Sequence, residues 1–417
     1  MSRLEDAKAI QKSDPAKAEA EYKAILSRKP DTTDAALKEY EQALLALGEL
    51  YRDGGRTQEL AALVEQTMSV LNQFAKSKTN KLVRQMIDLF STIPDTLDIQ
   101  ITLTKSCIQW AVNERRTFLR QGLETRLIAL YLEKNAYKDA IDLINTLLRE
   151  IKRLDDKMVL VEVQLLESRA YHALRNIPKS RASLSAARTS ANAVYCPPLM
   201  QAGLDMQSGI LHAEEKDFNT AYSYFIEAME GYHTQDETKK ATDALKYMLL
   251  CRIMENQTDE VNSILVGKHA LKYAGRDLEA MKAIARAHTD KSLAAFEQAL
   301  NSYKDELTAD RFIRSHSTDL YDNLLQQNLL RVIEPFSRVE IAHIAKLVGL
   351  DTPQVEAKLS RMILDKKLSG VLDQGTGCLI IFEETGKDKS YDAAIATIKK
   401  LSDVVDVLYT NQAALLD

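Results

Sequence analysis

A repeat of about 40 residues runs along most of this chain and constrains its fold more than any other feature. At each repeat a helical pattern ends in a large side chain, a short polar turn follows, and a second helical pattern begins. Tyrosine recurs in this register at Tyr51, Tyr131 and Tyr171, and Leu211 and Cys251 follow in the same register. A period of this length is typical of proteins built from stacked pairs of helices.

The turns and the residues that follow them support the same interpretation. The turns fall at residues 53–55, 134–135, 175–178, 214–217 and 255–257. Small or apolar residues near the start of each second helix are Leu60, Ala140, Ala182, Ala221 and Val261. One helical pair cannot bury its own apolar face, so neighbouring pairs must stack. We therefore expect a right-handed, TPR-like helical solenoid over residues 1–300. The alternative is a set of independent helical bundles.

After residue 300 the pattern changes to two helices and a hairpin. Ser337 and Glu340 have the spacing of a capping box and predict a helix start. The apolar face of that helix should comprise Ile341, Ile344, Leu347 and Val348. Gly349 should end the helix, because glycine adopts the left-handed conformation without steric cost.

A second helix should begin with Thr352 as its cap and Pro353 in its first turn. Its inward residues should be Val355, Leu359, Met362 and Ile363. Short β-rich runs at 370–373 and 378–384 flank a turn at 374–377, which is the pattern of a hairpin. Together with a bridging helix over 317–332, these elements predict a winged helix within residues 301–385.

A last helix is expected within residues 386–417. Its apolar side chains alternate at spacings of four and three, as in a coiled-coil seam. The seam positions are Ala394, Ile398, Leu401, Val405, Leu408, Gln412 and Leu415. The seam either packs against a partner chain or folds back on the solenoid. We favour a partner, with Ile398, Leu401, Val405, Leu408 and Leu415 in the contact.

Composition and motifs argue against an enzyme or a membrane protein. No apolar run approaches the roughly 18 residues that span a bilayer. The seven histidines are isolated and form no metal-binding pattern. Phosphate-binding glycine loops and the G-x-S-x-G nucleophile motif are absent. Four cysteines without a C-x-x-C pair predict buried thiols in a reducing compartment. We expect a soluble intracellular protein with no cofactor and no catalytic residue.

Two groups of basic residues are candidate binding sites. The second helix of the predicted winged helix carries basic residues that could contact nucleic-acid phosphates, namely Lys358, Arg361, Lys366 and Lys367. However, residues 335–384 hold six basic and seven acidic side chains, a net of −1 in a chain of net charge −5, so a nucleic-acid adaptor is only an alternative. Within the solenoid, Arg115, Arg116 and Arg120 could dock an acidic partner, or could be ordinary solvated helix surface.

Helical repeats that run into a winged helix resemble the PCI family of scaffold proteins. The runs FSRVEIAHIAKL (336–347), MILDKK (362–367), LDQGTGCLIIF (372–382) and TKSCIQW (104–110) resemble one branch of it. That branch comprises proteasome lid subunits of the non-ATPase regulatory subunit 11 type.

The resemblance implies a non-catalytic scaffold in ubiquitin-dependent protein degradation, located in the cytoplasm and nucleus. It implies that the winged helix and last helix join other lid subunits. It also implies that the solenoid clamps the lid to the α-ring of the proteolytic core and to the ATPase ring. A scaffold of the related signalosome is the alternative within the family.

Overall fold

The computed structural model describes residues 15–26, 34–68, 76–93, 96–267, 270, 272–273, 275–382 and 389–413. Its internal contacts divide the chain into two compact units. Unit 1 comprises Met1–Glu255 and Ser263–Tyr273, and unit 2 comprises Asn256–Asn262 and Ala274–Asp417. The predicted domain boundaries after residues 300 and 385 stay a prediction.

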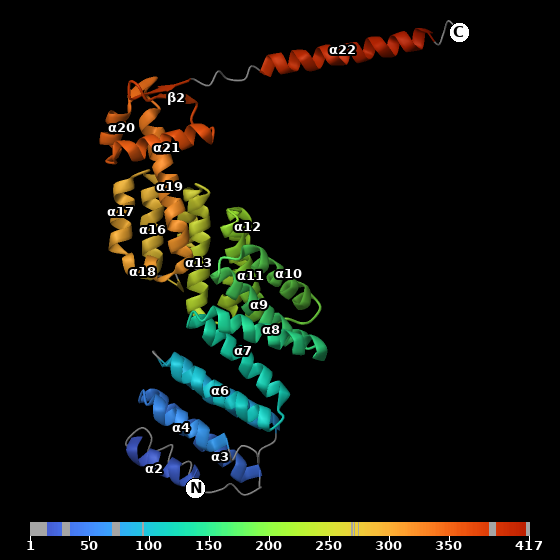
Figure 1. Ribbon diagram of the computed structural model, residues 1–417, viewed down its shortest axis with the longest axis vertical. Coiled ribbons are helices and arrows are strands. Elements are labelled where there is room, and N and C mark those ends of the chain that lie inside the picture. Colours follow the sequence, from blue (N-terminus) through green and yellow to red (C-terminus); the bar gives the residue numbers. More distant parts are fainter. Residues whose placement is uncertain are drawn as a thin grey trace. The chain divides into compact units, whose positions relative to one another are not determined.

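Unit 1 consists of helices stacked in consecutive antiparallel pairs (Figure 1). They are α2 (Pro15–Leu26), α3 (Asp34–Asp53), α4 (Thr57–Met68), α5 (Lys76–Asp88) with the short 3₁₀ turn η2 (Leu89–Thr92), α6 (Leu97–Asn113), α7 (Thr117–Glu133), α8 (Tyr137–Leu154), α9 (Lys157–Ala173), α10 (Ile177–Asn192), α11 (Pro198–Glu214), α12 (Phe218–Thr234) and α13 (Thr238–Met254). The next helix, α14 (Thr258–Val266), has residues in both units. The expected fold class is confirmed: a stack of helical repeats precedes a winged helix and a long last helix.

The predicted repeat arises from one turn geometry. The left-handed residue of the turn is Gly55 (φ 65°), Asn135 (φ 64°) or Arg175 (φ 59°) in three examples. In each case the next residue donates its N–H to the carbonyl five positions earlier, which belongs to Tyr51, Tyr131 or Tyr171 at 2.9 Å. This bond satisfies a carbonyl that the helix end leaves without a partner. Tyr51, Tyr131 and Tyr171 thus share one position of the turn, which His212 takes in the α11–α12 turn in place of the predicted Leu211.

The residue that closes each turn also begins the next helix. The carbonyls of Arg56, Ala136, Asn176 and Asp217 accept from the N–H four residues later. Those later residues are Leu60, Ala140, Ser180 and Ala221, and all are fully buried. Ala182, the small residue noted near the start of α10, is exposed, and Ser180 lies at the inward position. The Ser180 hydroxyl donates to the Ser168 carbonyl at 2.7 Å, which satisfies its polarity inside the stack.

Unit 2 contains α16 (Arg276–Thr289), α17 (Leu293–Ser302), α18 (Lys304–Ala309), α19 (Arg311–Ile333), strand β1 (Arg338–Glu340), α20 (Ile341–Val348), α21 (Thr352–Leu364), strands β2 (Gly370–Asp373) and β3 (Cys378–Ile381), and α22 (Lys389–Ala413). The strands form an antiparallel sheet in the order β1-β3-β2. Leu379 of the central strand is fully buried and pairs with both Val339 and Leu372. Helices α20 and α21 with this sheet make the predicted winged helix.

The capping-box prediction is wrong, because residues 338–340 form a strand. Val339 is buried between the exposed Arg338 and Glu340, which is the alternation of a strand with one covered face. The Ser337 carbonyl accepts from the Ile381 N–H at 2.9 Å and is thus part of the sheet. Helix α20 begins only at Ile341, and no side chain caps it.

The structure confirms some of the other predictions for the two helices of the winged helix and contradicts others. Gly349 ends α20 with φ 78°, as predicted. Leu347 is 56% exposed, so its predicted inward position is wrong and Ala345 is buried instead. The cap of α21 is Asp351 rather than Thr352. On α21, the predicted inward residues Val355, Leu359 and Met362 are buried, while Ile363 is only partly covered.

Two glycines of α11 provide a matched test of how closely the helices approach. A Cβ on Gly209 would lie 2.6 Å from Cε1 of Phe225, whereas a Cβ on Gly203 would lie at an ordinary 3.4 Å from Leu165. Phe225 is fully buried and packs edge-on against Tyr247, so it has no free space into which to move.

We expect Gly209→Ala to lower the free energy of unfolding by about 1–3 kcal/mol through overpacking. Gly203→Ala should leave it unchanged or raise it by up to about 1 kcal/mol, because alanine favours the helix. Urea denaturation of the two variants measures both values. Equal stability of the two would contradict the close approach of α11 and α12.

Candidate protein-interaction surfaces

The last helix, α22, exposes a continuous set of apolar side chains. Every α22 residue whose side chain the structure describes is exposed. The predicted seam residues Ile398, Leu401, Val405 and Leu408 are 67%, 60%, 57% and 60% exposed. Leu415 lies outside the described residues. Within the described part of unit 2, the seam is thus uncovered.

The apolar face of α22 is wider than a two-stranded seam requires. At about 100° per residue, Ile395 and Val404 flank the seam on its two sides and extend the face to roughly half of the helix circumference. Lys399, Asp403 and Asp406 occupy the opposite side, which Val407 shares. A strict coiled-coil seam uses two positions in seven. The face of α22 is therefore wide enough for more than one partner helix.

The three arginines near the start of α7 do different things. Arg115 is exposed and takes the left-handed turn position with φ 52°. Arg116 is buried, with its guanidinium 4.8 Å from the centre of the Trp110 ring. Arg120 forms ion pairs with Glu124 and Glu150. Of the predicted group, Arg116 and Arg120 thus make contacts within unit 1, and Arg115 faces solvent.

The basic residues of α21 are likewise partly engaged within unit 2. Lys358 Nζ lies 2.7 Å from a carboxylate oxygen of Asp322 on α19, and its side chain is 15% exposed. Lys367 donates to Gln326 of the same helix at 2.7 Å. Arg361 and Lys366 are exposed. Of the four predicted cations, Lys358 and Arg361 lie on α21, whereas Lys366 and Lys367 follow its end at Leu364. Lys358 and Lys367 contact α19 of the same chain.

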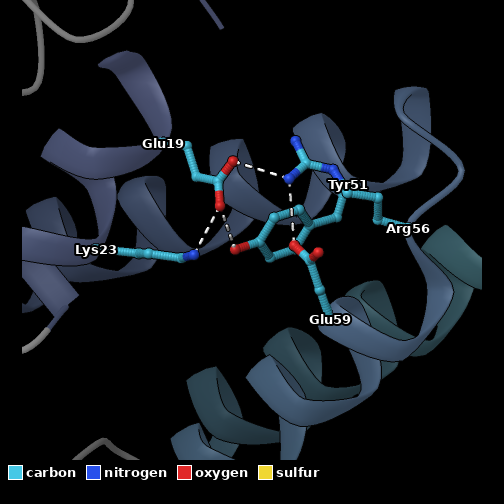
Figure 2. A network of polar contacts seen from close by, with 5 residues as sticks. All are labelled: Glu19, Lys23, Tyr51, Arg56 and Glu59. Carbon is cyan, nitrogen blue, oxygen red and sulfur yellow. Dashed lines mark hydrogen bonds and ion pairs between the residues drawn. The ribbon is translucent and has the colours of Figure 1, made fainter. Parts of the chain in front are cut away.

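Sequence reasoning missed a polar cluster at the N-terminal end of unit 1, which Figure 2 shows. The Glu19 carboxylate on α2 accepts from Lys23 at 2.6 Å, from the Tyr51 hydroxyl at 3.2 Å and from Arg56 at 3.0 Å. Arg56 also reaches Glu59 at 3.3 Å. This cluster fastens α2 to the turn between α3 and α4.

The same cluster borders a cavity of about 460 Å³ between α2, α3 and α4. The side chains of Lys23 and Arg56 lie 5.8 Å and 5.2 Å from the centre of the Tyr51 ring. The hydrogen bond from Lys23 is the main cause that holds the pKa of Glu19 below its ordinary value, against a smaller opposing effect of burial. The turn places Tyr51 and Arg56 together, but the sequence carries no local signal that Glu19 joins them, because it lies 32 and 37 residues away.

Within the described residues, no group of three or more histidine, cysteine, aspartate or glutamate side chains could hold a metal ion. None of the described helices combines the length and apolar character needed to cross a bilayer. All four cysteines are free, and burial raises the pKa of Cys107 and Cys251 to about 12. Cys196 is only partly covered, which corrects the expectation that every thiol is buried.

A stack of helical pairs that leads into a winged helix is the architecture of the PCI class of proteins, and the PCI domain model matches residues 300–383. Two further models match, namely the 26S proteasome regulatory subunit RPN6 N-terminal domain over residues 1–134 and the RPN6 C-terminal helix domain over residues 387–413. The chain belongs to the family of 26S proteasome regulatory subunit RPN6, also named non-ATPase regulatory subunit 11.

Relatives from distant organisms match nearly the full chain. The probable 26S proteasome regulatory subunit rpn6 of Schizosaccharomyces pombe is 57% identical, covering 98% of this chain and 97% of the relative. The non-ATPase regulatory subunit 11 homolog of Arabidopsis thaliana is 50% identical over 93% of this chain and 92% of its own length. Saccharomyces cerevisiae RPN6 is 45% identical over 99% of both chains. These matches decide for the proteasome branch over the signalosome alternative.

We expect the attachment of α2 to weaken in acid. The folded-state pKa of Glu19 lies below its ordinary value of 4.5, so its charge stabilises the folded chain fully above that pH. This stabilisation, less than about 1 kcal/mol for a pair near the surface, is lost as the pH falls through the lower folded-state pKa. Hydrogen-exchange protection of α2, corrected for the intrinsic rate, measures it.

Glu19→Gln should remove most of this acid sensitivity, whereas Glu21→Gln on the exposed side of α2 should retain it. The same acid loss of protection in both variants would show that Glu19 does not fasten α2.

Proposed function

We propose that this chain is a non-catalytic scaffold subunit of the proteasome lid that supports ubiquitin-dependent protein degradation. Its winged helix and α22 join other lid subunits, and its helical repeats contact the proteolytic core and the ATPase ring. The observation that carries the proposal is the uncovered apolar face of α22, in a helix that matches the RPN6 C-terminal helix domain.

The size of that face is adequate for stable assembly. Burying a large aliphatic side chain contributes about 1.5–3 kcal/mol. Four seam residues, Ile398, Leu401, Val405 and Leu408, would together contribute on the order of 10 kcal/mol before the entropic cost of association. Such a surface is costly to leave in water, so a partner protein is the physical reason to retain it.

The winged helix supports protein contact over nucleic-acid contact. Its net charge gives little attraction to phosphates, and Lys358 and Lys367 are engaged with α19. The sheet instead offers two outer strands, β1 and β2, whose free backbone groups can pair with a strand of another chain. The relatives carry the names of regulatory and non-ATPase subunits, which supports a role without catalysis.

Truncation after Ser390 tests the role of α22. The truncated chain should fold with an unchanged melting temperature, because the described side chains of α22 are exposed and contribute nothing to the core. It should fail to co-sediment with the proteasome regulatory particle, since the seam is missing. A full-length Ile398→Ser/Leu408→Ser variant should fail in the same way.

The matched control is Lys399→Ser/Asp403→Ser, which changes the opposite side of the same helix and should leave assembly intact. Normal incorporation of the truncated chain would refute the role proposed for α22.

The nucleic-acid alternative makes a separate prediction. We expect no salt-sensitive binding of duplex DNA by the full-length chain, and no change in Lys358→Ala/Arg361→Ala, because the winged helix has no excess positive charge. Fluorescence anisotropy with labelled DNA at low salt measures this. Tight binding that those two substitutions abolish would favour the adaptor function instead.

A further inference from the structure

Consecutive connections of unit 1 alternate between two edges of the stack. Because the helices are antiparallel, the α6–α7, α8–α9 and α10–α11 connections lie on one edge, and the α7–α8, α9–α10 and α11–α12 connections lie on the other. Figure 1 shows the first three on the right-hand side of unit 1. We call the first edge the rim and define it by Val112, Phe118, Leu154, Tyr195 and Leu199.

Exposed apolar side chains gather on the rim. Between residues 96 and 254, all of which the structure describes, six large apolar side chains are exposed, and five of them are the rim residues. The sixth, Leu174, lies on the opposite edge and is 46% exposed. Phe118 and Tyr195 are 67% and 83% exposed. Single exposed apolar side chains are ordinary, so the observation that points to a contact is their concentration on one edge.

The turn geometry does not explain this asymmetry. The α6–α7 turn on the rim and the α7–α8 turn on the opposite edge have the same left-handed residue, Arg115 with φ 52° and Asn135 with φ 64°. Both turns make the same hydrogen bond to the carbonyl five residues earlier. Phe118, just after the rim turn, is 67% exposed, whereas Tyr137, just after the opposite turn, is partly buried. The choice of side chain, and not the backbone, makes the rim apolar.

Contacts below the rim hold it rigid. Arg116 is buried against Trp110, which fixes the α6–α7 turn, and Arg120 pairs with Glu150 in the last turns of α8. The Asp156 side chain accepts from the Val159 N–H at 3.4 Å and caps α9. A surface fixed in advance loses little entropy when it binds.

The charge of the rim identifies the chemistry of its partner. In residues 112–118 and 152–157 the exposed charged side chains are four basic and two acidic, namely Arg115, Lys152, Arg153, Lys157, Glu114 and Asp155. This local excess of positive charge contrasts with the net charge of −5 for the whole chain. A complementary surface is acidic and carries apolar groups that cover Phe118 and Tyr195.

We propose that the rim docks an acidic, partly apolar surface of a neighbouring proteasome subunit. The proposal rests on the proposed function and assigns one edge of unit 1 to a contact within the assembly. Exposed aromatic residues beside arginines are the side-chain types that contribute most to binding at protein interfaces. The rim is thus a second contact, separate in sequence from α22.

Photo-crosslinking in the assembled 26S proteasome tests the rim directly. The full-length chain carries a photoreactive phenylalanine analogue at position 118 or 195, or at position 174 as the matched control on the opposite edge. We expect crosslinks from positions 118 and 195 to an acidic segment of another proteasome subunit, and little or no crosslinking from 174.

Substitutions measure the contribution to binding. Phe118→Ser/Tyr195→Ser should lower the affinity of the chain for the remainder of the proteasome by about 10-fold, with the melting temperature unchanged because both side chains are exposed. Arg115→Glu/Arg153→Glu should have a similar effect that diminishes at high salt. Leu174→Ser should change the affinity less than about 2-fold.

The outcomes separate the two proposals. If the parent chain enters the proteasome but the rim variants enter equally well, the rim proposal is wrong and the proposed function stands. Crosslinks from position 118 to a second copy of this chain or to nucleic acid would also overturn the rim proposal. If the parent chain does not enter the proteasome, the proposed function fails, and the rim proposal fails with it.

Discussion

The repeats of this chain depend on one backbone hydrogen bond. In several turns it joins the residue after the left-handed residue to the carbonyl five positions earlier, as in Arg56 to Tyr51 and Asn176 to Tyr171. The residue that donates this hydrogen bond also begins the next helix. One bond therefore ends one helix and sets where the following helix starts. The inward position then falls four residues later, which places Ala140 and Ala221 against the neighbouring pair.

Stacking in this way buries the inner helices on several sides, and polar side chains are buried with the apolar ones. Asp205 on α11 has a side chain only 4% exposed, and burial raises its pKa. Arg188 on α10 compensates at 3.2 Å, and its guanidinium also stacks on Tyr224 of α12. Removing one member of such a set would leave a buried charge without its partner. These polar contacts link three successive helices and thereby fix their register.

Features that depend on residues close together in the sequence could be predicted, and features that depend on residues far apart could not. The Tyr51, Tyr131 and Tyr171 register and the Gly349 helix end depend on bonds between residues a few positions apart, so spacing alone revealed them. Strand β1 was missed because its pairing with Cys378–Ile380 joins residues about 40 positions apart, and a local capping pattern suggested a helix. The role of Glu19 was missed for the same reason, since Tyr51 and Arg56 lie 32 and 37 residues away. The seam of α22 was predictable because heptad spacing is local.

The two proposed contact surfaces differ in the physics that each contributes to assembly. The face of α22 offers a broad apolar area on a helix that this chain leaves uncovered, so it supplies much of the binding free energy but little orientation. The rim offers fewer side chains, but Trp110, Arg116 and the Arg120–Glu150 pair hold them in place. A rigid, sparse surface adds little area and restricts the orientations that a partner can take. In the proposed scaffold, α22 therefore determines whether the chain is retained, and the rim determines how its repeats are aligned against their neighbour.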